Sequence, residues 1–239
     1  MDTVKINRQN VKIVAHRGLS GIETENTASA FVAAGNRSYY GIETDIHRTS
    51  DGKFICIHDG NLLRVAGRDM TVEDKTLAEV QSITLLDKDG TKGRADLIAP
   101  ALENYISICK KYGKHAVLEL KSRFTDEETA SIVSVIDGYG YLPSTTFISF
   151  VYENLLKIKK LIPNQSVQFL FSTFTNEIVE NVLRDRMDID VKHSELTKEI
   201  IDKMHEKGIK VNCWTVDSKE RAEQLVEWGV DYITSNILE

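Results

Sequence analysis

The chain of 239 residues contains little cysteine and no long hydrophobic run. Its three cysteines, Cys56, Cys109 and Cys213, are too few and too widely spaced for a disulfide framework or a zinc site. Each lies in an apolar stretch, so we expect three buried free thiols. No apolar stretch approaches the length of a membrane span, and no integral membrane segment is expected.

An excess of basic residues is also missing, because the formal net charge is −6. Binding to a polyanion normally requires a basic surface, so we do not expect nucleic acid as a partner. A small anionic substrate needs only a local basic pocket. The first residues, "MDTVKINRQN", lack the apolar segment of a signal peptide and predict a cytoplasmic protein. A chain whose signal peptide had been replaced by a methionine would look the same. The sequence gives no indication of oligomeric state.

Short strand-like runs alternate with amphipathic, helix-like segments along the whole chain. The predicted strands cover 12–16, 41–47, 54–59, 115–121, 145–149, 166–171, 187–191, 209–216 and 230–235. Segments typical of helices include 26–35, 102–113, 126–140, 197–208 and 218–229. Each of these begins near a Thr, Ser, Asn or Asp, and most end at a glycine. This alternation predicts a parallel α/β fold.

The second and third predicted strands are joined by only four residues, "SDGK". So short a link forms a hairpin turn and makes the pair antiparallel, whereas a parallel neighbour would need a crossover of about a dozen residues. Without the hairpin strand eight strands remain, which predicts a TIM (β/α)8 barrel in a single domain over 1–239. A doubly wound sheet is the alternative, but no glycine-rich phosphate loop supports it. An insertion over about 60–100 follows the hairpin, with a short helix predicted at 77–83.

Charged residues occupy the inward positions of the predicted barrel strands. Side chains alternate along a strand, so Glu43 and Asp45 share the face opposite to the isoleucines at 42 and 46. The isoleucines must face the helices, which directs both carboxylates inward. The same alternation directs Glu119, Lys121 and Trp214 inward, and active sites of TIM barrels lie where these strands end.

Three carboxylates, Glu43, Asp45 and Glu119, therefore converge on one cavity. Like charges in a poorly solvated place are costly unless something neutralises them. One divalent cation, Mg²⁺ or Ca²⁺, suits this all-oxygen ligand set. An internal salt-bridge network of the carboxylates with Arg17 and Lys121 is the alternative.

Two histidines, His16 and His58, are predicted at the same rim of the barrel. A pair of imidazoles can act as general base and general acid near neutral pH. Arg17 and Lys121 offer donors for a phosphate group. Together with a metal ion these groups indicate cleavage of a phosphodiester. The remaining histidines, at 47, 115, 193 and 205, are interpreted as structural or surface residues.

Several motifs occur in one order along nearly the whole chain. They are "AHRG" (15–18), "ENT" (25–27), "GIETDIHRTSDGKFICIHD" (41–59), "LRVAG" (63–67), "LEN" (102–104), "LELK" (118–121), "ISF" (148–150) and "VNCWTV" (211–216). With these motifs the chain resembles the glycerophosphodiester phosphodiesterase family, from about residue 11 to 235. One position departs from the family pattern, because Thr24 replaces the proline of P-E-N-T, and we expect a looser loop there.

The resemblance implies a TIM barrel that hydrolyses glycerophosphodiesters, such as glycerophosphocholine or glycerophosphoethanolamine, to glycerol 3-phosphate and an alcohol. It implies Mg²⁺ or Ca²⁺ at Glu43, Asp45 and Glu119, a catalytic pair of His16 and His58, and phosphate contacts from Arg17 and Lys121. Trp214 matches an aromatic residue that packs on the glycerol, and Phe150 matches a residue of the pocket, although a core role for Phe150 is equally open. The family is thought to attack phosphorus with the glycerol 2-hydroxyl, through a cyclic phosphate.

Two other functions stay open. Lysophospholipids carry the same glycerophosphodiester with an acyl chain, and their cleavage would need an apolar groove at the mouth, for instance from "NLLRV" (61–65). The insertion is polar, which disfavours this reading. A barrel that binds a phosphorylated glycerol without cleaving it would be expected to lack a histidine or a carboxylate, and none is missing. The sequence does not indicate which alcohol is released.

Overall fold

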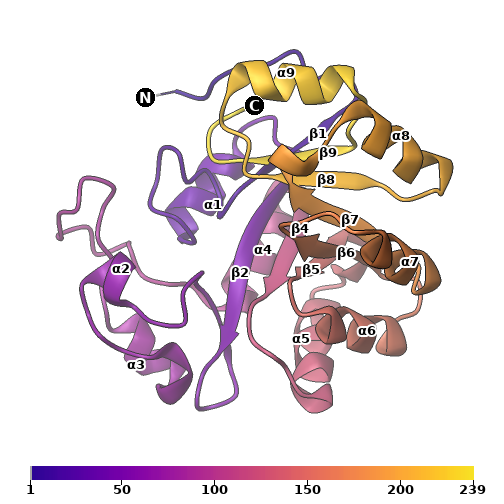
Figure 1. The fold of residues 1–239 in the computed structure, drawn as a ribbon. Helices are drawn as coiled ribbons and strands as arrows, with labels where there is room; N and C mark the ends of the chain where they lie inside the picture. The colour runs from indigo at the N-terminus through magenta and orange to yellow at the C-terminus, as the bar shows by residue number, and fades with distance from the viewer. Residues whose placement is uncertain (1) are drawn as a thin grey trace.

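Eight parallel strands form a closed barrel in the computed structural model, which describes residues 2–239 (Figure 1). Around the ring the order is β1-β9-β8-β7-β6-β5-β4-β2, and pairing of β1 with β2 closes it. The strands are β1 (Lys12–Ala15), β2 (Gly41–Arg48), β4 (His115–Leu120), β5 (Thr145–Ser149), β6 (Ser166–Phe171), β7 (Asp188–Lys192), β8 (Val211–Trp214) and β9 (Tyr232–Ser235). All neighbouring pairs in the ring are parallel. The predicted TIM barrel is confirmed.

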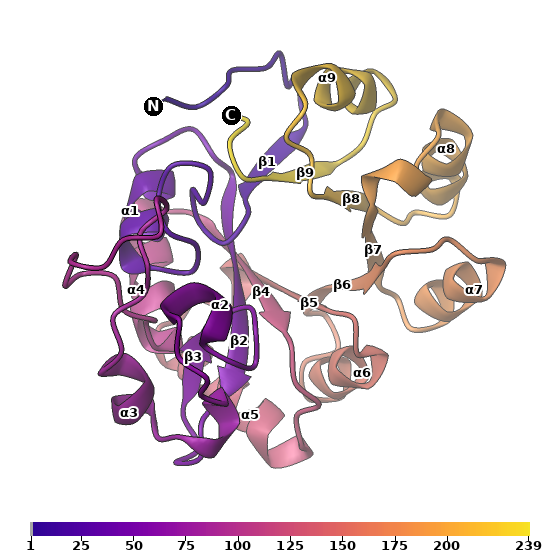
Figure 2. The same cartoon turned by 60° about the vertical axis from the view of Figure 1, so that its left-hand side comes forward.

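Helices surround the ring of strands (Figure 2). They are α1 (Ala28–Gly35), α4 (Leu102–Tyr112), α5 (Asp126–Gly138), α6 (Tyr152–Leu161), α7 (Asn176–Arg184), α8 (Lys198–Glu206) and α9 (Lys219–Glu227), with short 3-10 turns η2 (Leu142–Ser144) and η3 (His193–Glu195). A hydroxyl side chain caps the first turn of α1, α5, α7, α8 and α9 by accepting a backbone N–H. These caps satisfy donors that the helix itself leaves free, and they explain where the helices begin.

A hairpin extends β2 beyond the barrel. Strand β3 (Phe54–Cys56) pairs antiparallel with the end of β2, with Ile46 opposite Cys56. Gly52 forms the tip at a φ of +70°, a left-handed conformation that glycine adopts without a steric cost. The predicted hairpin is therefore present, and it returns the chain to the rim of the barrel at His58.

The segment between β3 and α4 forms a small structure of its own beside β2 (Figure 1). It contains α2 (Leu63–Ala66), η1 (Val72–Asp74) and α3 (Leu77–Gln81), and α3 lies inside the predicted 77–83. Short helix α2 was not predicted. A separate hydrophobic cluster holds this segment together and comprises Ile55, Ile57, Leu62, Val65, Ala66, Val72, Val80, Leu85, Leu97 and Ala99.

The two faces of the barrel strands carry different kinds of side chain. Outward residues such as Ile42 and Leu118 belong to the main core between strands and helices. Inside the barrel, Val14, Val117, Ile148 and Leu170 form a small apolar cluster. Burial of such side chains contributes about 1.5–3 kcal/mol each. Beyond this cluster the inner face carries the carboxylates of Glu43, Asp45 and Glu119, so the barrel combines an apolar interior with a polar end.

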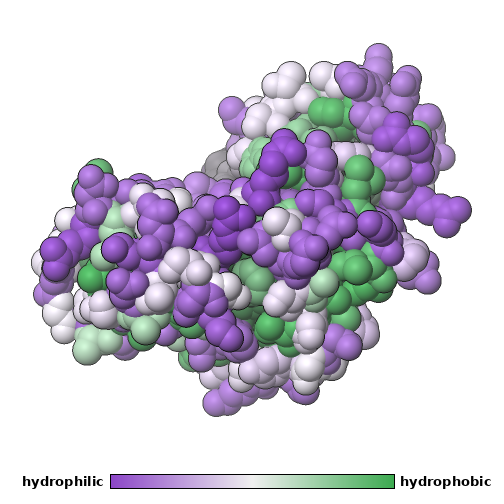
Figure 3. Space-filling model, turned by 90° about the horizontal axis from the view of Figure 1, so that it is seen from below, coloured by the Kyte–Doolittle hydropathy of each residue, from purple (hydrophilic) through white to green (hydrophobic). Residues whose placement is uncertain are grey.

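Several of the residues interpreted as structural make their contacts away from this polar end. The three cysteines are buried and free. His115 stacks on Tyr40 and donates to or accepts from Thr146 Oγ1 at 2.8 Å, at the start of its strand. His205 pairs with Asp231. The face shown in Figure 3 is mostly hydrophilic with smaller hydrophobic patches. Within residues 2–239 no helix is both long enough and apolar enough to cross a bilayer.

Candidate active site

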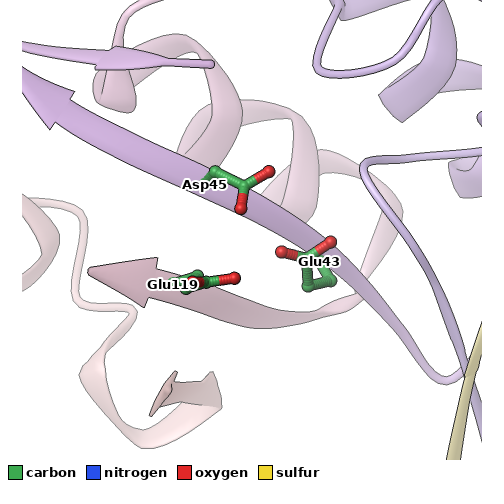
Figure 4. A group of neighbouring side chains, drawn as sticks. All are labelled: Glu43, Asp45 and Glu119. Atoms are coloured by element: carbon green, nitrogen blue, oxygen red, sulfur yellow. The ribbon is translucent and has the colours of Figure 1, made fainter. Parts of the chain in front are cut away.

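Three buried carboxylates point toward one another where β2 and β4 lie side by side (Figure 4). Glu43 and Asp45 alternate on β2, and the strand register places Asp45 beside Glu119 of β4. One carboxylate oxygen from each residue lies within 4.8 Å of the others. Their exposed fractions are only 2%, 1% and 8%. Three negative charges so close together and so poorly hydrated require positive charge nearby.

Two cationic side chains supply part of that charge. Lys121 Nζ lies 2.8 Å from Glu119 and 3.5 Å from Asp45, and Arg17 Nε lies 3.5 Å from Asp45. Burial and the two neighbouring carboxylates raise the pKa of Glu43. Burial and Asp45 raise the pKa of Glu119 to about 8. Burial acts in the same direction on Asp45, but Lys121 and Arg17 outweigh it and hold its pKa at about 2. A salt-bridge network alone leaves the site short of positive charge.

The donor atoms of the cluster fit a divalent cation. Asp45 Oδ1 is buried, and among the described residues no group donates a hydrogen bond to it. A buried carboxylate oxygen without such a partner is unfavourable unless a ligand contacts it. The three carboxylates offer only oxygen ligands, which hard cations such as Mg²⁺ and Ca²⁺ prefer. The geometry therefore fits a metal site, and both cations accept this donor set.

The loop after β1 is held in a strained conformation against the cluster. Arg17 has a φ of +54°, which is uncommon for a residue with a side chain. In this conformation its backbone N–H donates to Glu43 Oε2 at 2.7 Å, while its guanidinium donates to Glu25 at 2.9 Å. Gly18 follows at a φ of +76°, and a Cβ there would lie 2.7 Å from Ala30. Such local strain typically occurs at functional sites, where surrounding contacts maintain it.

His16 is fixed in one tautomer by a neighbouring amide. Asn236 Nδ2 donates to Asp217 at 2.6 Å, which directs Asn236 Oδ1 toward the imidazole. Because this oxygen can only accept, His16 Nδ1 carries the hydrogen and donates at 2.7 Å. Burial and the nearby Arg17 lower the pKa of His16. The ring is therefore neutral near pH 7, with Nε2 free to accept a proton.

His58 is held differently, by a carboxylate. Its Nδ1 donates to Asp59 at 2.6 Å, and Arg64 Nε donates to the other oxygen of Asp59 at 2.6 Å. Burial lowers the pKa of His58, while Asp45 and the hydrogen bond to Asp59 oppose that effect. His47 donates from Nε2 to the His58 carbonyl at 3.0 Å, so this third histidine supports the loop.

Most of the predicted site residues border one cavity of about 120 Å³, far more than the roughly 15 Å³ that a single water needs. These are His16, Arg17, Glu43, His58, Glu119, Lys121, Phe150 and Trp214, and Asp45 lies behind them. Phe150 and Trp214 pack edge to face, with ring centroids 5.5 Å apart. Phe150 is 45% exposed, which does not fit a core residue. The two rings form an apolar wall beside the Lys121 ammonium.

Some residues of the site were not assigned a role from the sequence. Arg64 of α2 donates to both oxygens of Glu25, at 2.9 and 2.8 Å, and so joins the insertion to the loop that carries Arg17. The motifs "ENT" and "LRVAG" contained both residues, but nothing in them indicated the contact. Asn236 and Asp190 lie in no motif that indicated a place in the site.

Thr24, which stands where the family pattern has proline, makes a hydrogen bond of its own. This side chain is buried, and its hydroxyl donates to the Leu86 carbonyl at 3.1 Å. A proline could not make this bond. The hydroxyl thus gives the loop a hydrogen bond that proline would not, and the looser loop expected here stays a prediction.

A TIM barrel whose mouth combines an acidic cluster, two anchored imidazoles and two cations has the groups that a metal-assisted phosphodiesterase needs. The family model described as "Glycerophosphoryl diester phosphodiesterase family" matches residues 16–238. The chain belongs to this family, whose members are phosphoric diester hydrolases.

Relatives of this chain agree with the assignment. A glycerophosphodiester phosphodiesterase of Caldanaerobacter subterraneus subsp. tengcongensis is 28% identical over 229 residues, covering 94% of this chain and 93% of the relative. A glycerophosphodiester phosphodiesterase of Bacillus subtilis is 26% identical over 241 residues, covering 93% and 82%. Among solved structures, an Oleispira antarctica phosphodiesterase in complex with the product sn-glycerol-3-phosphate has a TM-score of 0.86 and 25% identity, covering 98% of this chain and 96% of that one.

Proposed function

We propose that this enzyme hydrolyses glycerophosphodiesters, such as glycerophosphocholine and glycerophosphoethanolamine, to sn-glycerol 3-phosphate and an alcohol. The observation that carries the proposal is the cluster of three buried carboxylates within 4.8 Å of one another, beside two anchored imidazoles. The Oleispira antarctica phosphodiesterase, which has the same fold, binds sn-glycerol-3-phosphate as its product. Family membership supports the same substrate class.

Glu43, Asp45 and Glu119 would hold one divalent cation, Mg²⁺ or Ca²⁺. When bound, the cation would neutralise the cluster, contact a phosphate oxygen and lower the pKa of the attacking hydroxyl. Lys121 and Arg17 donate to the remaining phosphate oxygens and offset the negative charge that develops on them. Phe150 and Trp214 contact the carbon chain of the glycerol.

The two imidazoles have opposite roles in this proposal. A general base must be unprotonated at rest, and burial beside Arg17 keeps His16 neutral with Nε2 free. We therefore assign to His16 the removal of the proton from the glycerol 2-hydroxyl, which attacks phosphorus. A general acid must be protonated when it acts. Burial lowers the pKa of His58, but the Asp59 carboxylate opposes this effect and favours the protonated imidazole, whereas Nδ1 of His16 faces only a neutral amide. His58 then donates its proton to the oxygen of the departing alcohol, which leaves a cyclic phosphate between the 2- and 3-oxygens of the glycerol. A water molecule next attacks this phosphorus and loses a proton to solvent, the bond from phosphorus to the 2-oxygen breaks, and His16 returns its proton to that oxygen, which gives sn-glycerol 3-phosphate.

Release of sn-glycerol 3-phosphate from glycerophosphocholine and glycerophosphoethanolamine tests the proposal, with Mg²⁺, with Ca²⁺ and with EDTA. We expect cation-dependent release that Glu43→Gln abolishes, while Glu128→Gln retains it, because Glu128 pairs with Arg48 away from the cavity. The cation should also raise the melting temperature of the wild type but not of Glu43→Gln. No release with either cation, from folded protein, would refute the proposed reaction.

The other two functions are distinguishable in the same assay. Faster release of choline from lysophosphatidylcholine than from glycerophosphocholine would favour a lysophospholipid substrate. Binding of sn-glycerol 3-phosphate without turnover of either diester would favour a barrel that only binds a phosphorylated glycerol.

A further inference from the structure

Asp190, in the middle of β7, lies in the wall of the active-site cavity without a role in the proposed reaction. Its neighbours Ile189 and Val191 face the helices and belong to the main core, so the carboxylate faces the barrel interior. It borders the same cavity as His16, Glu119 and Trp214. The side chain lies between β6 and β8, where the register pairs Asp190 with Leu170 and Asn212.

The carboxyl group of Asp190 is buried, and its Oδ1 has no hydrogen-bond partner among the described residues. The residue is only 1% exposed, and Oδ1 receives no hydrogen bond from any group among residues 2–239. No lysine, arginine or histidine of the described chain forms an ion pair with it. Its backbone carbonyl, by contrast, accepts a hydrogen bond from Trp214 Nε1 at 3.3 Å. A buried carboxyl group in this state is unfavourable unless a ligand supplies the missing hydrogen bond.

The polar side chains of the neighbouring strands β6, β8 and β9 that lie next to Asp190 have hydrogen-bond partners within the protein. Asn212 Nδ2 donates to Gln168 Oε1 at 3.0 Å, and Thr234 Oγ1 donates to Asn212 Oδ1 at 3.3 Å. Asp190 differs from these neighbours because it borders the cavity and remains unpaired. The unpaired group is therefore directed at the space where a ligand would lie.

The chemistry of a glycerophosphodiester determines which of its groups can contact Asp190. The phosphate has only acceptor oxygens and fits Arg17, Lys121 and a cation. Choline has no hydrogen-bond donor. A glycerol hydroxyl can both donate and accept, so it pairs with a carboxyl group in either protonation state. The 2-hydroxyl must stay beside phosphorus and His16, which leaves the terminal hydroxyl of the glycerol.

We propose that Asp190 binds the terminal hydroxyl of the glycerol moiety and thereby selects glycerol phosphates over analogues without that hydroxyl. This inference rests on the proposed function for the placement of the phosphate, but its test does not need turnover. Glycerol would then lie against the barrel interior, with the phosphate at the acidic cluster and the alcohol directed to solvent.

The test compares two ligands that differ by one hydroxyl. Calorimetry in Mg²⁺ measures the binding of sn-glycerol 3-phosphate and of propane-1,2-diol 1-phosphate, which lacks only the terminal hydroxyl. We expect the wild type to prefer sn-glycerol 3-phosphate by about 3- to 100-fold, the range from one hydrogen bond between neutral groups to one with a charged group. In Asp190→Leu this preference should fall to about twofold or less. Any change of charge at position 190 acts on both phosphates alike, so the ratio of the two affinities isolates the hydroxyl.

Two further variants make the result specific. Asp190→Ala is interpreted in the same way if the leucine variant does not fold, and Asp190→Asn, which still pairs with a hydroxyl, should retain part of the preference. Gln168→Leu is the matched control, because Gln168 is a buried polar residue of the same barrel interior that bonds to Asn212 and does not border the cavity. It should lower the melting temperature and leave the preference unchanged.

Equal binding of both ligands to the wild type, or a preference that survives in Asp190→Leu, would overturn the assignment even if the enzyme cleaves glycerophosphocholine. A preference lost only in the Asp190 variants would support the assignment, even if no diester were cleaved and the proposed function failed. Absence of any binding of sn-glycerol 3-phosphate would overturn both.

Discussion

Replacing the His58 imidazole by an amide, in His58→Gln, removes the group that we propose protonates the departing alcohol. Asp59 and Arg64 keep their ion pair, so the loop after β3 stays anchored. Loss of a general acid typically costs about 10²- to 10⁴-fold in rate, and we expect this loss for glycerophosphocholine. With the p-nitrophenyl ester of sn-glycerol 3-phosphate the leaving anion needs no proton. The loss on that substrate should be less than about tenfold.

The contact that supports His58 sets the size of a second, smaller effect. His58 Nδ1 and Asp59 Oδ1 are 2.6 Å apart. A hydrogen bond to a charged group contributes about 1.5–3 kcal/mol. Since about 1.36 kcal/mol corresponds to a tenfold change in rate, Asp59→Asn should lower choline release by about 10- to 100-fold. Without the carboxylate the pKa of His58 falls, so the alkaline limb of the pH–rate profile should move to lower pH.

His16→Gln provides the comparison that makes the assignment falsifiable. The base is needed whichever group leaves, so this variant should lose about 10²- to 10⁴-fold on both substrates. Choline and p-nitrophenolate release are measured in parallel, with circular dichroism melts to verify folding. The assignment is refuted if His58→Gln loses as much rate on the nitrophenyl ester as on glycerophosphocholine. It is also refuted if His16→Gln, rather than His58→Gln, has a near-wild-type rate on this ester.

Three further changes probe the phosphate site, the acid stability and a helix cap. Arg17→Lys should lower kcat/KM by about 10- to 100-fold without unfolding, because one ammonium cannot replace a guanidinium that contacts both Glu25 and Asp45; near-wild-type kinetics would contradict this. Burial lowers the pKa of His115 from 6.5 to about 4. Below pH 6.5 the unfolded chain therefore binds a proton at this residue that the folded chain excludes. Between pH 7 and pH 4 the free energy of unfolding, measured by urea titration, should fall by about 3 kcal/mol more in the wild type than in His115→Phe. Equal falls in the two proteins would show that His115 does not titrate in this way. Thr125→Ala removes the cap of α5 and should cost about 1 kcal/mol, or about 2–4 °C in melting temperature, with unchanged activity; a loss of activity in folded protein would argue against a purely structural cap.

Much of the fold follows from local pattern in the sequence. Eight apolar runs separated by capped helical segments predict a TIM barrel, because short alternating elements can bury their apolar faces only in such layers. The hairpin follows from a four-residue link with Asp51-Gly52 at its tip. The period of two along a strand directs Glu43 and Asp45 inward whatever the rest of the chain does. Helix α2 escaped prediction because four residues carry too little periodicity.

The contacts that tune the site depend on closure of the barrel. His16 and Asn236 are 220 positions apart in sequence and meet because β1 pairs with β9. Arg64 reaches Glu25 only after the insertion folds on its own hydrophobic cluster. The sequence by itself determined which face each side chain takes, since that depends on the geometry of a single strand. The tertiary structure decided which side chains then meet on that face, and that no donor among residues 2–239 reaches Asp190 Oδ1, because register and closure set the distances between strands.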